Sequence, residues 1–325
     1  MRMLRIDHET KLLYTQPIIE SVVEVRMAPL STEDQTVLGY KLRTSPTINP
    51  TTYRDGFGNR VELVTLMAAH AELAIRAASC VRVHRRSATE RLAGVAWPAE
   101  PTASIDAMEY LRASPLVDFT SEIQAFSDSL PKPEGSFLQV VESLMHACRA
   151  ALKYEKKVTE AHTPVSEALK LGCGVCQDFA HLFLATARLA GLPARYVSGY
   201  VHQPGELATH AWTQVWAGNS VGWVDIDPTQ GKWVEQDHIV TAVGRDFSDV
   251  PPNRGVWKGN AQETINVTVN VQIVDRVPSD LSDHAQGPGW TSSGPGVPDR
   301  LGRATASNQQ RKRQMFRQQQ SQQQQ

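Results

Sequence analysis

The sequence has little cysteine, no long apolar run and almost no net charge. Four cysteines in 325 residues are too few for a disulfide scaffold of this size, and they suit a reducing compartment where thiols stay free. No stretch approaches the roughly 18 apolar residues of a membrane-spanning helix. The first residues also lack the apolar run of a secretory signal. These absences predict a cytoplasmic protein that has no membrane partner.

The charges of the chain nearly cancel, with 33 Lys and Arg against 34 Asp and Glu and a net charge of −1. Such a chain has no overall field that would attract nucleic acid or an anionic membrane surface. The hydrophobic content of 41% can fill real cores, and the length suits two domains of roughly 100–200 residues each. We therefore expect a globular protein with no specific nucleic-acid partner.

Residues 1–95 have the pattern of short β-strands. The turn-forming sequence DGFGN at 55–59 is followed at once by the β-branched run 61–66, which is a hairpin signal. A further strand is expected from about 72 to 83, and no long helical period interrupts the region. Short strands at regular spacing predict an N-terminal β-sandwich domain over residues 1–95.

Residues 96–276 change from helical to strand patterns. Apolar residues repeat every three or four positions over 137–148, which predicts an amphipathic helix. A second helix should begin near Cys176 and end before Gly191 and Pro193, a typical helix-stop pair. Helices followed by an antiparallel sheet predict an α+β domain. The expected strands are 195–201, 210–217, 222–226, 239–243 and 264–274.

Residues 277–325 are rich in Gly, Pro, Ser and Gln and end in RKRQMFRQQQSQQQQ. This composition cannot bury enough apolar surface to offset the entropy lost on ordering. The segment is predicted to be a disordered tail.

A cysteine, a histidine and an aspartate stand where cysteine-nucleophile chemistry needs them. A reactive thiolate is favoured at a helix start and beside an imidazole, which a carboxylate must orient. Cys176 follows the glycine-rich LGCGV and opens a predicted helix, His210 begins a strand, and Asp227 ends the next one. Adjacent antiparallel strands bring the start of one beside the end of the next. These three residues are therefore the candidate catalytic site.

At these residues the sequence resembles the transglutaminase-like superfamily, specifically its bacterial members with an added N-terminal β-domain. The matching stretches are GVCQDFAHLFLATARLAGLPARYVSGYV, HAWTQVW and GWVDIDPTQG, with LRIDHETKLLYTQP and DGFGN in the first domain. The resemblance implies a papain-like fold for residues 96–276, with Cys176 as nucleophile, His210 as base and Asp227 as the orienting acid. It implies no cofactor and no metal, because no loop matches the acidic calcium loop of animal relatives.

The resemblance implies acyl transfer on a peptide or protein amide through a thioester. Resolution by water would make a protease or amidase, and resolution by an amine would make a transglutaminase; the sequence leaves both open. Asp225 competes with Asp227 because both point to one face of a strand, but the Asp-Pro-Thr context of the family falls at Asp227. Two other functions stay open, a non-catalytic peptide-binding module and a redox or metal protein using Cys173 and Cys176.

Overall fold

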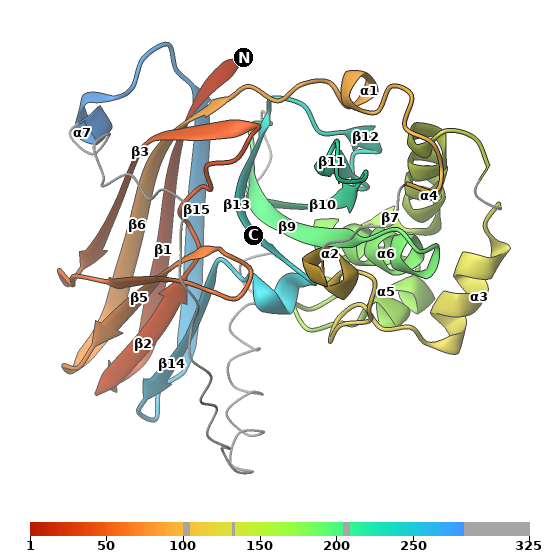
Figure 1. Ribbon diagram of the computed structural model, residues 1–325. Helices are drawn as coiled ribbons and strands as arrows, with labels where there is room; N and C mark the ends of the chain where they lie inside the picture. Colours follow the sequence, from red (N-terminus) through yellow and green to blue (C-terminus); the bar gives the residue numbers. More distant parts are fainter. Residues whose placement is uncertain (100–104, 132–133, 204–208, 283–325) are drawn as a thin grey trace.

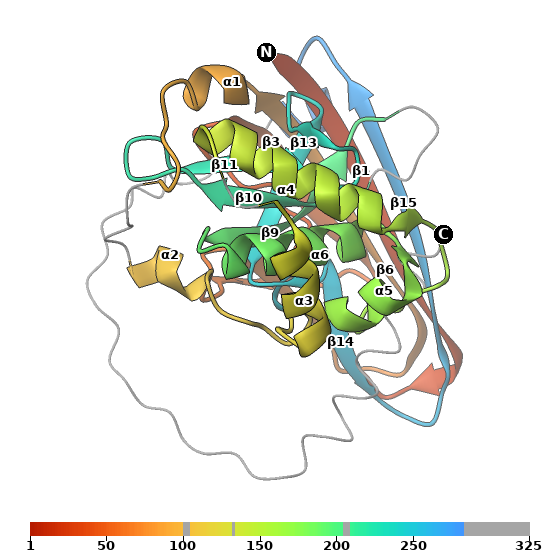
Figure 2. The ribbon, with the colours of Figure 1, turned by 90° about the vertical axis from the view of Figure 1, so that its right-hand side faces the viewer.

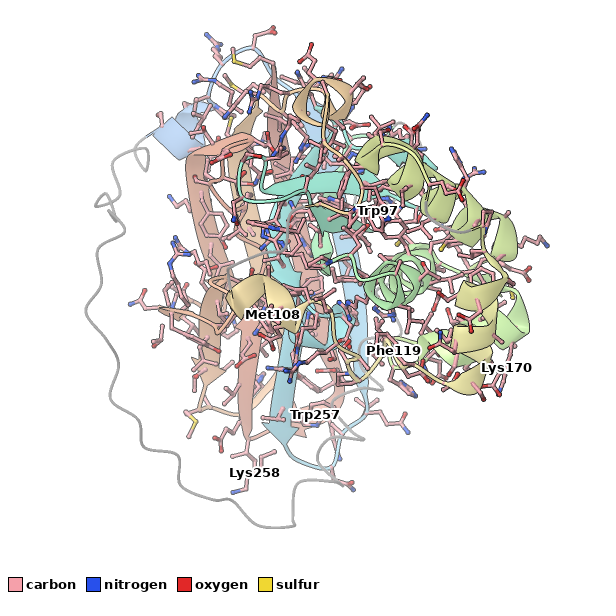
Figure 3. The ribbon with its side chains drawn as sticks, turned by 45° about the vertical axis from the view of Figure 1, so that its right-hand side comes forward. Trp97, Met108, Phe119, Lys170, Trp257 and Lys258 are labelled. Carbon is pink, nitrogen blue, oxygen red and sulfur yellow. The ribbon has the colours of Figure 1, made fainter. Side chains whose placement is uncertain are left out.

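The computed structural model describes residues 1–99, 105–131, 134–203 and 209–282. Two bodies lie side by side, one made of long strands and the other of helices over a sheet (Figure 1). Partly buried Trp257 lies in the strand body, whereas Trp97 and Phe119 lie on the helical side (Figure 3). The predicted α+β class, with a β-sandwich and a separate core, is confirmed.

Two four-stranded antiparallel sheets form the sandwich. The predicted hairpin is present, because the turn at 55–59 joins two strands that pair from Thr51↔Leu63 to Arg54↔Arg60. The first sheet has the order β15-β1-β6-β3, with β1 (Arg2–Ile18), β3 (Gln35–Ser45), β6 (His70–Val83) and β15 (Glu263–Ile273). The second has the order β14-β2-β5-β4, with β2 (Glu20–Val25), β4 (Thr51–Arg54), β5 (Arg60–Leu66) and β14 (Asn253–Lys258).

The sandwich core follows from the period of two along its strands. Alternate residues of β1 are buried over most of its length, as expected when one face of a sheet packs on another. Leu12 of β1, Val23 of β2 and Ile75 of β6 meet in this core. Burying each such side chain contributes about 1.5–3 kcal/mol, so the inward faces hold the two sheets together.

Two strands of the sandwich come from the far part of the chain. β15 pairs with β1 from Leu4↔Ile273 to Tyr14↔Glu263, and β14 pairs with β2. The prediction that residues up to 276 belong to the second domain is therefore wrong for 253–273. The alternation of apolar and polar residues correctly indicated a strand at 264–274. The alternation could not show that this strand pairs with β1. It shows which side chains face the core, but it is the same whichever strand lies alongside.

The core body has a five-stranded antiparallel sheet of order β12-β11-β10-β9-β13. These strands are β9 (Ala194–Val201), β10 (Thr209–Trp216), β11 (Trp223–Asp227), β12 (Lys232–Trp233) and β13 (His238–Gly244). Four helices lie over one face of it (Figure 2), namely α3 (Ser121–Ser129), α4 (Phe137–Ala151), α5 (Val165–Leu171) and α6 (Cys176–Leu189). The two helices predicted from periodicity are α4 and α6. No helix in the described ranges is long and apolar enough to cross a membrane.

Helix α6 is the central element of the core body. It packs on β9 and β10 on one side and on α4 on another, so all of its residues from Gln177 to Arg188 are buried. The chain leaves the helix through Gly191 at φ 79°, a left-handed conformation that glycine adopts without steric cost. The short elements around it are α1 (Ala88–Arg91), α2 (Ile105–Glu109), β7 (Lys153–Tyr154), β8 (Cys173–Gly174) and the 3₁₀ turn Phe247–Asp249.

The sandwich supports the free edge of the core sheet. Strand β13 lies at that edge, and two side-chain amides of the sandwich bond its backbone. The amide of Gln35 donates to Val240 O at 2.9 Å and accepts from Val240 N at 2.9 Å. Asn59 does the same at Val243, with both distances 2.8 Å. These amides occupy the backbone positions that a neighbouring strand would otherwise fill.

A short helix beyond β15 docks on the sandwich. Leu281 of α7 (Ser279–Ser282) is 0% exposed, and Arg5 pairs with Asp280 at 2.9 Å. Gly39 of β3 permits this contact, since a Cβ there would lie 2.7 Å from Leu281 O. The prediction of a disordered tail from 277 is therefore wrong for 279–282. Residues 283–325 lie outside the described residues, so for them it stays a prediction.

We predict that Leu281→Ala lowers the free energy of unfolding by about 2 kcal/mol or more, because it empties a buried site. Urea denaturation measures the change. Ile273→Ala in β15 is the matched control, since Ile273 is 52% exposed and its loss should change little. Equal stabilities of Leu281→Ala and the wild type would show that α7 does not dock.

Candidate active site

Cys176 is the first residue of α6, so its thiol lies at the positive end of a helix dipole. The turn before it is held by Asp178, whose Oδ2 accepts from Val175 N at 2.8 Å and from Thr159 Oγ1 at 2.7 Å. Burial raises the pKa of Asp178 to about 6 against these hydrogen bonds. Gly174 is required here, since a Cβ would lie 2.5 Å from the Asp178 carboxylate.

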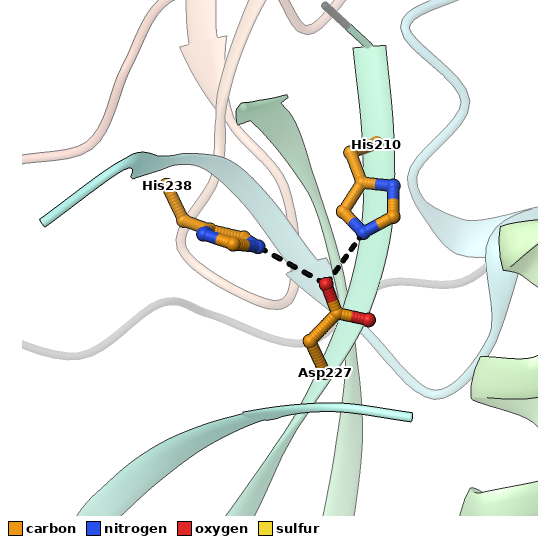
Figure 4. Close-up of side chains that lie close together, drawn as sticks. All are labelled: His210, Asp227 and His238. Carbon is orange, nitrogen blue, oxygen red and sulfur yellow. Dashed lines mark hydrogen bonds and ion pairs between the residues drawn. The ribbon is translucent and has the colours of Figure 1, made fainter. Parts of the chain in front are cut away.

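His210 lies between the other two predicted residues. It is the second residue of β10, and Asp227 is the last of β11. His210 Nε2 lies 2.7 Å from Asp227 Oδ2 (Figure 4), and interactions with both Asp227 and Cys176 raise the pKa of His210. Because Nε2 faces the carboxylate, Nδ1 is the ring nitrogen left for the thiol. The structure therefore brings Cys176, His210 and Asp227 together in the predicted order.

The electrostatic environment favours the charged forms of both His210 and Asp227. Burial disfavours the imidazolium of His210, but hydrogen bonds to Asp227 and Cys176 outweigh it and raise its pKa to about 10. Burial also disfavours the Asp227 carboxylate, but hydrogen bonds from His210 and His238 outweigh it and hold its pKa well below the usual range. The pair is thus stabilised as imidazolium and carboxylate.

The backbone fixes the orientation of Asp227. Its Oδ1 accepts from Thr229 N at 2.9 Å and from Gln230 N at 3.0 Å, the pattern of an Asx turn. Oδ2 is thereby aimed at the histidines. The Asp-Pro-Thr sequence thus supplies both the strand end and the turn that orients the carboxylate.

His238 is a residue of the site that sequence reasoning missed. Its Nε2 lies 3.2 Å from Asp227 Oδ2, and its Nδ1 lies 2.8 Å from Asp237 Oδ1. The side chain is 0% exposed. The sequence offered only an Asp-His pair before an apolar run. It could not show that β13, which pairs with β9, begins within reach of the end of β11.

Asp225 bonds the aromatic side chain of Trp212, whereas Asp227 bonds His210. Its Oδ1 accepts from Trp212 Nε1 at 2.7 Å and from Gln214 Nε2 at 2.9 Å. The Trp212 ring stacks on His210 with centroids 6.2 Å apart and meets His238 edge-on at 5.0 Å. The prediction that favoured Asp227 over Asp225 as the partner of His210 thus agrees with the geometry.

The segment that joins the sandwich to the core provides the counter-charge of Asp225. Arg85 Nε lies 3.5 Å from Asp225 Oδ2 and 3.8 Å from Asp34 Oδ2. Arg91 NH1 binds the same Asp34 oxygen at 3.0 Å. Arg85 and Asp225 are almost completely buried, so loss of either charge would leave the other less well compensated in the interior.

A cleft of about 700 Å³ lies beside the site, within the usual range for a bound ligand. Asp237, which bonds His238, forms part of its wall. The lining residues include Arg2 and Arg86 on the sandwich side, Glu142 and His146 on α4, and Lys232 and Trp233 of β12.

Comparisons with known proteins match both parts of the chain. Residues 124–228 match the transglutaminase-like superfamily, and residues 4–82 match the bacterial transglutaminase-like N-terminal region. An uncharacterized protein of Mycobacterium leprae is 32% identical over 278 residues, covering 82% of this chain and 98% of that protein. An uncharacterized protein of Mycobacterium tuberculosis is 30% identical over 289 residues, covering 83% and 92%.

Among solved structures, a candidate cysteine protease from Cytophaga hutchinsonii is similar with a TM-score of 0.70. It is 20% identical, and the match covers 86% of this chain and 93% of that one. At this identity the likeness shows the fold alone.

The sandwich, the helix-covered antiparallel sheet and the grouped Cys176, His210 and Asp227 are those of a papain-like α+β fold. The chain belongs to the transglutaminase-like superfamily and carries the bacterial N-terminal region of that family. The resemblance to the transglutaminase-like superfamily, predicted from the sequence, is confirmed. This membership supports a cysteine-dependent enzyme.

We predict that Asp225→Ala lowers the free energy of unfolding by about 3 kcal/mol or more, because it removes the nearer carboxylate from the buried Arg85 and the acceptor of Trp212 Nε1 and Gln214 Nε2. Urea denaturation gives the value. Glu155→Ala breaks the exposed Lys153–Glu155 pair, 3.1 Å apart, and should cost less than about 1 kcal/mol. Similar losses in the two variants would contradict a structural role for the buried pair.

The raised pKa of His210 makes its contribution to stability dependent on pH. The folded protein binds this proton more tightly, so the contribution is complete below the unfolded pKa near 6.5 and is lost as pH rises toward about 10. The stability difference between wild type and His210→Gln should shrink over this window by at most about 1.4 kcal/mol per pH unit. Urea unfolding at several pH values tests this, with exposed His146→Gln as control. A difference independent of pH would refute it.

Proposed function

We propose that this protein transfers acyl groups from peptide or protein amides through a Cys176–His210–Asp227 triad. The observation that carries the proposal is the position of His210, which bonds Asp227 at 2.7 Å and whose pKa is raised by interaction with Cys176 as well as Asp227. This is the relation of nucleophile, base and orienting acid that cysteine acyl transfer requires.

In the first half-reaction the Cys176 thiolate attacks the carbonyl carbon of the amide. The carbonyl electrons move to oxygen, and the unpaired backbone N–H groups at the start of a helix can stabilise such an oxyanion. When the carbon–nitrogen bond breaks, His210 Nδ1–H gives its proton to the leaving amine. The product of this half is a thioester on Cys176 and a free amine.

In the second half-reaction His210, now neutral, accepts a proton through Nδ1. The proton comes from water in hydrolysis or from a primary amine in transamidation, and either nucleophile displaces the thiolate. Asp227 keeps the hydrogen on Nε2 in both halves, because an ionised carboxylate can only accept. The family membership supports this chemistry without deciding between water and an amine.

The competing functions have weaker support. A binding module would not need a buried imidazole that bonds a carboxylate and interacts with a thiol at a helix start. A thioredoxin-like motif should lie in a βαβ unit, whereas antiparallel strands follow α6 here. Cytoplasmic location and a peptide or protein partner stay predictions.

We expect Cys176→Ala to lower the turnover of peptide amides by about 10⁶-fold, as loss of a nucleophile does in comparable triads. Cys173→Ala is the matched control, since Cys173 lies in β8 and is assigned no role. Release of amine from peptide amides, followed with and without an added primary amine, measures the effect. Product mass then separates hydrolysis from transamidation.

The opposite ranking of the two cysteine variants would overturn the assignment of the nucleophile. Equal activity of both variants and the wild type would remove the triad from the reaction altogether. Circular dichroism of each variant shows that the fold is retained, which is expected because alanine is tolerated at a helix start.

A further inference from the structure

Two imidazoles converge on a single carboxylate oxygen at the candidate active site. His210 Nε2 and His238 Nε2 lie 2.7 Å and 3.2 Å from Asp227 Oδ2 (Figure 4). The three ligand atoms lie within 4.8 Å of one another. The side chains of His210, Asp227 and His238 are only 11%, 0% and 0% exposed.

The spacing of these atoms suits a small metal ion. Zinc binds histidine nitrogen at about 2.0–2.1 Å and carboxylate oxygen at about 2.0–2.2 Å, so tetrahedral ligand atoms lie about 3.3 Å apart. The separations of 2.7 Å and 3.2 Å from Asp227 Oδ2 lie near this value, and the two histidine nitrogens, within 4.8 Å of each other, must move closer to reach it. A dication between the atoms would replace the two N–H protons that now face one oxygen.

Neighbouring groups hydrogen bond the three side chains and fix their orientation. In metal sites, residues around the ligands do the same. His238 Nδ1 binds Asp237 Oδ1 at 2.8 Å, which leaves Nε2 for a metal. Asp237 is itself held by Lys232 at 3.1 Å. The backbone amides on Asp227 Oδ1 leave Oδ2 free to be the ligand atom. Carboxylate–histidine–metal chains are a recurrent feature of zinc sites.

We infer that His210, Asp227 and His238 form an inhibitory site for a divalent transition-metal ion, for which zinc is the best match. The inference rests on the proposed function for the inhibition, and on geometry alone for the binding. In the bound state each imidazole carries its hydrogen on Nδ1, and any hydrogen on Nε2 is released as a proton. One zinc ion thus binds two nitrogens and one oxygen.

The bound metal would stop both half-reactions at His210. Nδ1 keeps its hydrogen while Nε2 holds the metal, so Nδ1 cannot accept a proton from water or an amine. It also cannot give its hydrogen to a leaving amine without forming a metal-bound imidazolate. The metal therefore blocks proton transfer without a bond to the Cys176 sulfur, so chelation should restore activity.

The competing arrangement places zinc between the Cys176 thiolate and His210 Nδ1, since zinc also binds thiolate. Zinc affinity, measured by competition with a chromophoric chelator, separates the two arrangements. For the inferred site, Cys176→Ala binds zinc as the wild type does, and His238→Gln weakens binding by more than about 100-fold. Asp237→Asn should weaken it by about 10–100-fold, the effect of an outer partner. Exposed His162→Gln is the matched control and should change nothing.

Loss of zinc binding in Cys176→Ala with retention in His238→Gln would overturn the inference, as would no competition by the wild type at micromolar zinc. Cobalt substitution adds a spectroscopic test, because the inferred site predicts no thiolate-to-cobalt charge-transfer band. If His238→Gln does not fold, the zinc affinity of Asp237→Asn and the cobalt spectrum still distinguish the inferred site from a site that includes Cys176. Zinc binding by these ligands in a protein that turns over no amide even after chelation would refute the proposed function and leave the site standing.

Discussion

The geometry of the site depends on the hydrogen bonds that the buried carboxylate of Asp227 accepts. A carboxylate with 0% exposure is costly unless hydrogen bonds and opposite charges compensate it. Four donors do so, two imidazoles on one oxygen and two backbone amides on the other. The amides fix its direction and the imidazoles balance its charge. The same satisfied carboxylate sets which nitrogen of His210 faces the thiol.

The sandwich contributes to this geometry through the edge of the core sheet. The amides of Gln35 and Asn59 fix the backbone of β13, and His238 is the first residue of that strand. Arg85 reaches Asp225, which in turn holds the Trp212 ring beside both histidines. Gly199 makes room for this ring, since a Cβ there would lie 2.5 Å from it. The first body of the chain is thus a structural support of the site.

The sequence predicted what local patterns and a known motif determine. Helix α6, the hairpin at 51–66 and the approach of His210 to Asp227 follow from periodicity, turn residues and strand order. The partner of β15 did not follow, because alternation is the same whichever strand lies alongside. His238 and Arg85 were missed for a related reason. Each acts on a residue far away in sequence, and a single histidine or arginine carries no spacing signal.

The order of elements along the chain has a consequence for how the protein is made. Strand β1 is synthesised early, but its neighbour β15 follows about 245 residues later. At typical rates of about 5–20 residues per second, the edge of β1 waits on the order of ten to fifty seconds for its partner. During that time it presents unpaired backbone groups to other nascent chains. The core, whose sheet and helices are contiguous in sequence, can fold first and serve as the surface on which the sandwich closes.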